Sequence, residues 1–247
     1  MPDILAFTES ADDRDGVSGV TMALAKTLHL TAEQRGLPTG AHDASAGVLL
    51  AVDDPTVRLA VLPYRPGNAA DLVTEVIRHC PKPVVLVPLD RHTTTPDLIS
   101  RILVPLDGTV EAAETVAETV ALFAASGADI VVLHVFDQTT VPKFWDQTAH
   151  ARKSWDEEFL ARYCDHPDAR LELRRGSPGE GILDVAETEH ADLIALGWAQ
   201  NLSPGRARTV RRTVADASTP ILLLPVPAAD ALDHGGLPSV VDAAVGP

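Results

Sequence analysis

The chain is poor in cysteine, in aromatic residues and in positive charge. Only two of its 247 residues are cysteines, Cys80 and Cys164, and neither lies in a CxxC or Cys/His cluster. A disulfide framework and a zinc site are therefore not indicated. Lys and Arg total 20 against 35 Asp and Glu, which gives a formal charge of -15. Because such a chain repels a polyphosphate backbone, we expect no nucleic-acid partner.

Long apolar runs are also missing. None approaches the ~20 residues that a helix needs to span a bilayer, so we expect no membrane partner. Residues 1–10 lack the basic region and the cleavage site of a signal peptide. With 45% hydrophobic and 22% charged residues, the composition is that of an ordinary globular protein. We therefore expect a soluble cytoplasmic protein made of one large domain or two small ones.

The apolar runs that do occur are short, rich in β-branched residues and nearly continuous. Strands buried on both faces of a parallel sheet have this pattern. Helical spacing of apolar residues separates them, for example over residues 110–124, where Thr109 is the expected N-cap. The alternation predicts an α/β fold. The predicted strands are residues 4–7, 59–62, 84–87, 102–106, 130–135, 193–196 and 221–224.

The chain also contains an internal repeat. Residues 69–89 and residues 210–226 share one order: a helix, a turn with proline, and an apolar strand closed by a second proline. We therefore divide the chain into a shortened unit at residues 1–92, a complete unit at 99–227 and a flexible tail at 228–247.

The first unit is expected to lack a strand–helix–strand segment. In the second unit a strand at 130–136, a helix near 146–164 and a strand at 171–174 precede the helix that begins at Gly181. In the first unit only about a dozen unpatterned residues, near positions 33–43, fill the same interval.

Motifs of the second unit resemble those of the universal stress protein family. They are the run ILVPLDGT at 102–109, VVLHV at 131–135, RGSPG at 175–179 and ADLIALG at 191–197. The resemblance covers residues 101–227 in order. In residues 1–92 it is weaker and rests mainly on Gly67-Asn68 and the helix and strand that follow.

The resemblance implies two tandem flavodoxin-like, Rossmann-like units with parallel sheets. In that family the last strands of two copies pair edge to edge. Here residues 84–87 and 221–224 would make the pair, so that one chain forms an intramolecular pseudo-dimer. A homodimer of whole chains and an unknown protein partner stay open.

Nucleotide-binding members of the family carry the pattern G-x2-G-x9-G-[ST] after the fourth strand. Gly197 matches its first position, and Thr213 supplies the hydroxyl two residues late. Gln200 and Arg212 replace the other two glycines, and Gly205 is out of register. Such a loop cradles phosphates with backbone N–H groups, and the hydroxyl caps the next helix. We therefore expect no required cofactor, and ATP or another adenine nucleotide stays possible as a ligand.

Asp107 matches the family aspartate that contacts the nucleoside. The alternative is a turn residue at the end of a strand that helps the next helix to begin. Similarly, Trp198 is either a base-stacking residue or a core residue, and His134 is expected to be a core histidine with its hydrogen bonds made.

Positive charge gathers near the altered loop. No acidic residue occurs between Gly197 and Ala215, whereas four arginines do: Arg206, Arg208, Arg211 and Arg212. Guanidinium groups suit phosphate or carboxylate, so we hypothesise that arginines replace the backbone cradle; the alternative is surface pairing with acids. The candidate nucleotide or anion site is Asp107, Gly197, Gly205, Arg206, Arg212 and Thr213.

No set of residues at recognisable spacing suggests catalysis or a metal site. The sequence therefore predicts a non-catalytic protein of the universal stress type, active in stress response or regulation, with an anionic ligand at the second unit. One alternative is an ATP-binding member that hydrolyses slowly. Another is a protein-interaction scaffold. In the first unit, the loop at residues 64–68 is too short to wrap a triphosphate.

Overall fold

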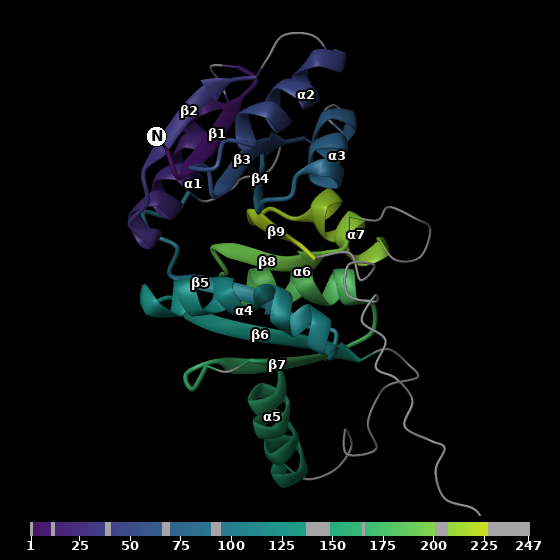
Figure 1. Cartoon of the computed structure of the whole chain (residues 1–247). Helices are drawn as coiled ribbons and strands as arrows, with labels where there is room; N and C mark the ends of the chain where they lie inside the picture. The colour runs from purple at the N-terminus through teal and green to yellow at the C-terminus, as the bar shows by residue number, and fades with distance from the viewer. Residues whose placement is uncertain are drawn as a thin grey trace, which may run out of the picture.

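The computed structural model describes residues 2–10, 13–37, 41–65, 70–89, 95–136, 149–164, 166–200 and 207–226. Within these ranges strands and helices alternate along the chain (Figure 1). The strands are β1 (Ile4–Thr8), β2 (Ala32–Gly36), β3 (Leu59–Tyr64), β4 (Val84–Pro88), β5 (Arg101–Pro105), β6 (Asp129–Phe136), β7 (Arg170–Arg175), β8 (Leu193–Trp198) and β9 (Ile221–Pro225). The helices are α1 (Arg14–Leu28), α2 (Ala41–Val52), α3 (Ala70–His79), α4 (Val110–Ala125), α5 (Ala149–Tyr163), α6 (Pro178–Thr188) and α7 (Arg208–Asp216).

The strands form one nine-stranded sheet in the order β2-β1-β3-β4-β9-β8-β5-β6-β7. Neighbouring strands are parallel except at the centre, where β4 and β9 are antiparallel. There Val84 lies opposite Leu223, and Val85 lies opposite Leu222. Figure 1 shows β1 to β4 on one side of this antiparallel contact and β5 to β9 on the other. The α/β fold and the predicted pairing of the two last strands are therefore confirmed.

Helices cover both faces of the sheet, which explains the continuous apolar runs. Buried residues of α1, α4 and α5 pack on one face, and those of α2, α3, α6 and α7 pack on the other. Successive strand residues alternate between the two cores: Leu103 belongs to one and Val104 to the other. A strand buried on both sides has no polar face to show in its sequence.

The prediction that the first half lacks a strand–helix–strand segment is wrong. The strand β2 pairs with β1 just as β6 pairs with β5, and among the described residues of the first half it is the counterparts of α5 and β7 that are missing. All five residues of β2 are exposed, and Glu33 pairs with Arg35 on it. A polar edge strand has no apolar pattern by which the sequence could predict it. Its charged side chains protect the edge of the sheet from pairing with further strands. Residues 90–94, between the two units, and residues 227–247, which include the predicted tail, lie outside the described residues.

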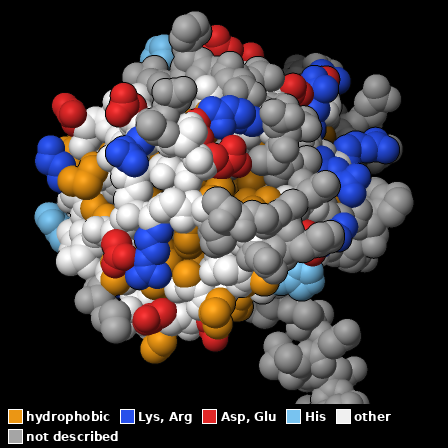
Figure 2. Space-filling model, turned by 90° about the horizontal axis from the view of Figure 1, so that it is seen from above, with side chains coloured by type: hydrophobic (Ala, Val, Ile, Leu, Met, Phe, Trp, Pro, Cys, Tyr) orange, Lys and Arg blue, Asp and Glu red, His pale blue; other side chains and the backbone are white. Residues whose placement is uncertain are grey.

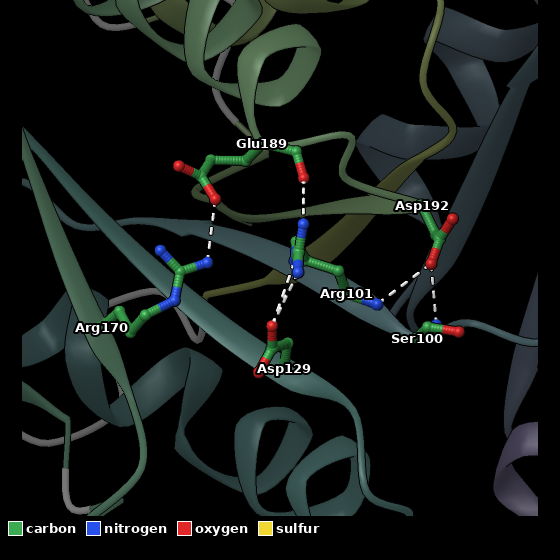
Figure 3. A network of polar contacts seen from close by, with 6 residues as sticks. All are labelled: Ser100, Arg101, Asp129, Arg170, Glu189 and Asp192. Carbon is green, nitrogen blue, oxygen red and sulfur yellow. Dashed lines mark hydrogen bonds and ion pairs between the residues drawn. The ribbon is translucent and has the colours of Figure 1, made fainter.

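At the amino ends of its strands, the second half is held by a network of ion pairs and hydrogen bonds (Figure 3). Arg101 of β5 donates to the Asp129 carboxylate at 2.9 and 3.2 Å and to the Glu189 carbonyl at 2.6 Å. Arg170 of β7 donates to the Glu189 carboxylate at 2.8 Å. The Asp192 carboxylate accepts from two backbone amides at the start of β5. The network joins four strands at the edge opposite the candidate site.

The face seen in Figure 2 carries both signs of charge side by side, with apolar side chains between them. Among the helices that the structure describes, none has the length and apolar character to cross a membrane.

Candidate functional site

The carboxyl ends of β5, β6 and β8 border a cavity of about 460 Å³, which we call the carboxyl-edge cavity. Ligand sites of parallel α/β sheets lie at this edge, and the volume falls in the range of roughly 300–1,000 Å³ common to small-molecule pockets. Asp107 and Gly197, predicted from the sequence, both line it. The lining residues are Pro105, Leu106, Asp107, Ala112, Leu133, His134, Val135, Pro178, Ile182, Leu196, Gly197, Thr209 and Val210.

Asp107 both starts α4 and keeps an acceptor for a ligand. Its Oδ1 accepts from the Thr109 amide at 2.9 Å and from the Thr109 hydroxyl at 2.7 Å. The Thr109 hydroxyl in turn accepts from the Ala112 amide at 3.3 Å, which confirms Thr109 as the N-cap. The chain reaches this turn through Gly108, whose φ of 85° favours glycine. The second oxygen of the exposed Asp107 has no partner among the described residues and is therefore available.

Two helices present amino ends without a side-chain cap beside the cavity. The N-cap of α7 is Ala207, whose side chain has no acceptor, and the Ser177 hydroxyl makes no capping bond to α6. The Arg211 amide bonds to the Ala207 carbonyl at 2.9 Å, so the amides before it in α7 lack an intrahelical acceptor. Amides without an intrahelical acceptor and the positive end of a helix dipole favour an anion.

Thr213 does not cap α7. The helix begins at Arg208, so Thr213 lies within it, is 0% exposed and has no hydrogen-bond partner for its hydroxyl among the described residues. The threonine that lines the cavity is Thr209, followed by Val210. The strict spacing of the motif, counted from Gly197, indicates this first turn of α7, because its last two positions fall on Val210 and Arg211.

Arg212 is not among the residues that line the cavity. Its Nε lies 3.0 Å from the Asp216 carboxylate and its Nη2 lies 4.0 Å from that of Glu180. The stem of the side chain lies against Gly179, where an added Cβ would be 2.8 Å from the Arg212 Cγ. This arrangement corresponds to surface pairing with acids. Gly205 and Arg206 lie outside the described residues, so their part in anion binding stays a prediction.

Two side chains near the end of β8 fasten it to the first half. Trp198 is 3% exposed, and its indole Nε1 donates to the Ile77 carbonyl of α3 at 3.0 Å. The Gln200 amide donates to the Cys80 carbonyl at 2.7 Å and to the Ile77 carbonyl at 3.3 Å. Its burial makes Trp198 a core residue, the second of the two alternatives. More than 100 residues separate the partners of both contacts, so no local sequence pattern indicates them.

His134 makes the predicted hydrogen bond, but it is half-buried and lines the carboxyl-edge cavity. Its Nδ1 lies 2.9 Å from the Leu106 carbonyl and therefore carries the proton. The ring packs between Phe136 and Phe159, with centroids 4.6 and 4.9 Å away. Phe159 also stacks on Trp155, with ring centroids 4.9 Å apart.

The corresponding edge of the first half holds an ion pair. Arg65, which follows β3, donates a hydrogen bond to the carboxylate of Asp13, just before α1. The Asp13 side chain is 1% exposed. The Arg65 guanidinium lowers the pKa of Asp13, against the opposing effect of burial. Residues 66–69 lie outside the described residues.

Comparison with known proteins agrees with this fold. The sequence profile of the universal stress protein family matches residues 99–225. A universal stress protein from Archaeoglobus fulgidus aligns with a TM-score of 0.66 at 12% identity, over 90% of this chain and 98% of that chain. A protein of unknown function from Pseudomonas aeruginosa aligns with a TM-score of 0.53 at 15% identity, over 90% of this chain and 81% of that one. At these identities the likeness is one of fold. No curated protein matches the chain in sequence.

Proposed function

Because the chain belongs to the universal stress protein family, we propose that it acts by binding a nucleoside phosphate in the carboxyl-edge cavity, without catalysis. The observation that carries this proposal is the combination of groups around one cavity. Apolar walls, a carboxylate oxygen and two uncapped helix ends suit the base, the sugar and the phosphate of such a ligand in turn.

Each part of the ligand has a matching part of the cavity. Leu133, Ile182 and Leu196 line it as apolar side chains that suit a flat base. The free oxygen of Asp107 is an acceptor for sugar hydroxyls. The first turn of α7, with the Thr209 hydroxyl, suits a phosphate.

The titratable groups of the cavity favour binding over chemistry. Among the described lining residues they are Asp107 and His134. The Nδ1 proton of His134 is used by the Leu106 carbonyl, and one oxygen of Asp107 is used by Thr109. A nucleophile with an adjacent base, as hydrolytic sites require, is not formed by these two residues. We therefore assign the protein a regulatory role in which ligand occupancy is the signal.

The first half serves this role as a shortened second copy. It supplies β4, which pairs with β9 and so covers the edge that the second half would otherwise expose. The ion pair of Asp13 and Arg65 lies where a ligand would enter the equivalent edge. We therefore expect one ligand per chain.

Thermal unfolding with AMP, adenosine and inorganic phosphate tests the proposal. A ligand at 100 times its Kd stabilises a protein by about 2.7 kcal/mol, so AMP should raise Tm measurably. Asp107→Asn keeps the acceptor for Thr109 but removes the charge, and should weaken the rise. The control is Glu114→Gln, which makes the same change in charge at an exposed position of α4 and should leave the rise intact. No shift with any of the three compounds would refute the function.

A further inference from the structure

A second cavity, of about 340 Å³, lies where the two halves meet, and we call it the junction cavity. It lies over β9, on the face of the sheet that α1 and α4 cover, beside the antiparallel contact with β4. Most of its lining residues are apolar, and both halves contribute them. They include Leu24 and Leu28 of α1, Leu59 of β3, Leu122 and Phe123 of α4, and Leu222 of β9.

The walls of the junction cavity leave apolar side chains in contact with water. Leu122 is 43% exposed, and Leu28 and Leu30 are half-buried. Apolar surface gathered in one concave place is removed from water when an apolar partner binds there, which favours binding. The volume lies near the lower end of the range of roughly 300–1,000 Å³ that small-molecule sites have. We therefore expect a small molecule as the occupant.

The charged residues at the rim of the junction cavity balance each other. Among the described lining residues they are Arg58, which precedes β3, and Glu118 of α4, and both are exposed. Neither makes an ion pair with another described residue. A charged ligand would meet a group of its own sign and would lose water, whereas an uncharged ligand leaves both charges hydrated. The rim therefore favours an uncharged ligand.

Two threonines of α4, one helical turn apart, also line the cavity. The Thr115 hydroxyl donates to the Glu111 carbonyl at 2.8 Å, so its proton is already used. The Thr119 hydroxyl has no hydrogen-bond partner among the described residues, and the residue is half-buried. A hydroxyl can donate and accept, so Thr119 is available to one polar atom of a ligand.

We propose that the junction cavity binds an uncharged, largely apolar molecule that carries one hydroxyl or carbonyl group. The apolar body lies against the leucines of both halves, and the polar atom bonds to the Thr119 hydroxyl. This site goes beyond the proposed function, because it is separate from the carboxyl-edge cavity. The two cavities are neighbours: a Cβ added to Gly197, which lines the carboxyl-edge cavity, would lie 3.8 Å from the Cγ2 of Thr115.

Calorimetric titration of the full chain with primary alcohols tests the proposal. Hexanol, heptanol and octanol add one methylene at a time to an apolar body with a single hydroxyl. Octanol should bind at one site per chain, and each added methylene should tighten binding about fourfold. Octanoate carries a negative charge and octylamine a positive one, and each should bind at least about tenfold more weakly than octanol.

Two pairs of variants locate the site. Thr119→Val removes the unbonded hydroxyl and should weaken octanol binding about fivefold, whereas Thr115→Val removes a hydroxyl that is already bonded and should leave binding unchanged. Leu122→Gln makes one wall polar and should also weaken binding about fivefold. Leu98→Gln is its control, because Leu98 is 42% exposed and is not among the lining residues. Unfolding in urea, measured in parallel, shows whether each variant is folded.

Each outcome supports or overturns the proposal. No heat of binding with octanol, or an equal affinity for octanoate or octylamine, overturns it. Octanol binding that is unchanged in the folded variants Thr119→Val and Leu122→Gln lies elsewhere and overturns it as well. A titration of the same proteins with AMP tests the proposed function separately. If AMP does not bind, that function fails, whereas the result with octanol still decides the junction cavity.

Discussion

The guanidinium of Arg65 donates a hydrogen bond to the buried carboxylate of Asp13, across 52 residues of sequence. The pair joins the end of β3 to the start of α1 at the carboxyl edge of the first half. In the second half the same edge is open and forms the carboxyl-edge cavity. The halves share the arrangement of four strands, to which the second adds β7. They thus differ in what their edges contain: an internal ion pair in one, and a space for a ligand in the other.

Replacing Asp13 by Asn should destabilise the protein. Removing one partner of a buried ion pair typically costs about 3–5 kcal/mol. Since the Arg65 side chain is 26% exposed, water can solvate it, and we expect a smaller loss of about 2 kcal/mol. The free energy of unfolding in urea measures this loss. Asp15→Asn, at an exposed position of the same helix, is the matched control, and an equal effect of the two changes would contradict the account.

Stability should fall in acid in a way that depends on two carboxylates. Arg65 lowers the pKa of Asp13, and Arg170 lowers the pKa of Glu189. Because both pKa values are lower in the folded than in the unfolded protein, the two groups stabilise the fold fully above their unfolded values, about 4. That stabilisation disappears as the pH falls through the folded values.

The Tm of the wild type should therefore decrease more steeply below about pH 4 than that of a double variant, Asp13→Asn with Glu189→Gln. Calorimetric scans between pH 7 and pH 3 compare the slopes. Parallel curves for the two proteins would show that these groups do not bind protons differently in the folded and unfolded states.

The two donors to the Ile77 carbonyl should act together. Trp198→Phe retains a buried ring but removes the indole N–H, and Gln200→Met removes the amide. Each should cost about 1 kcal/mol. Because both donate to one carbonyl, losing the second should cost more than losing the first, by at least about 0.5 kcal/mol in a double-mutant cycle. Strictly additive losses would mean that the two contacts are independent.

Elements with a strong apolar pattern could be predicted from the sequence, and those without it could not. The strand predicted at residues 102–106 is β5 (Arg101–Pro105), whose middle residues are buried, and the helix after Thr109 begins at its N-cap. The strand β2 was missed because it is an exposed edge strand of five residues, AEQRG, without apolar periodicity. The helix α2 (Ala41–Val52), which follows β2, was not predicted either.

The candidate site could be predicted only in part, for a similar reason. Asp107 and Gly197 follow strands that the pattern locates, so their meeting at one edge follows from the topology. The uneven match to the glycine motif indicated Thr213, which is buried within α7, whereas Thr209, one helical turn earlier, lines the cavity. The contacts of Gln200 with α3 and of Arg65 with Asp13 depend on tertiary packing, which local sequence does not encode.

Calorimetric titration with AMP, comparing the wild type with Asp107→Asn, tests the central claim most directly. The account predicts one site per chain, because the ion pair of Asp13 and Arg65 occupies the edge of the first half. It also predicts binding about tenfold weaker in the variant, as expected for the loss of one charge-assisted hydrogen bond. Two sites per chain, the same affinity in both proteins, or no heat of binding to the wild type would contradict it.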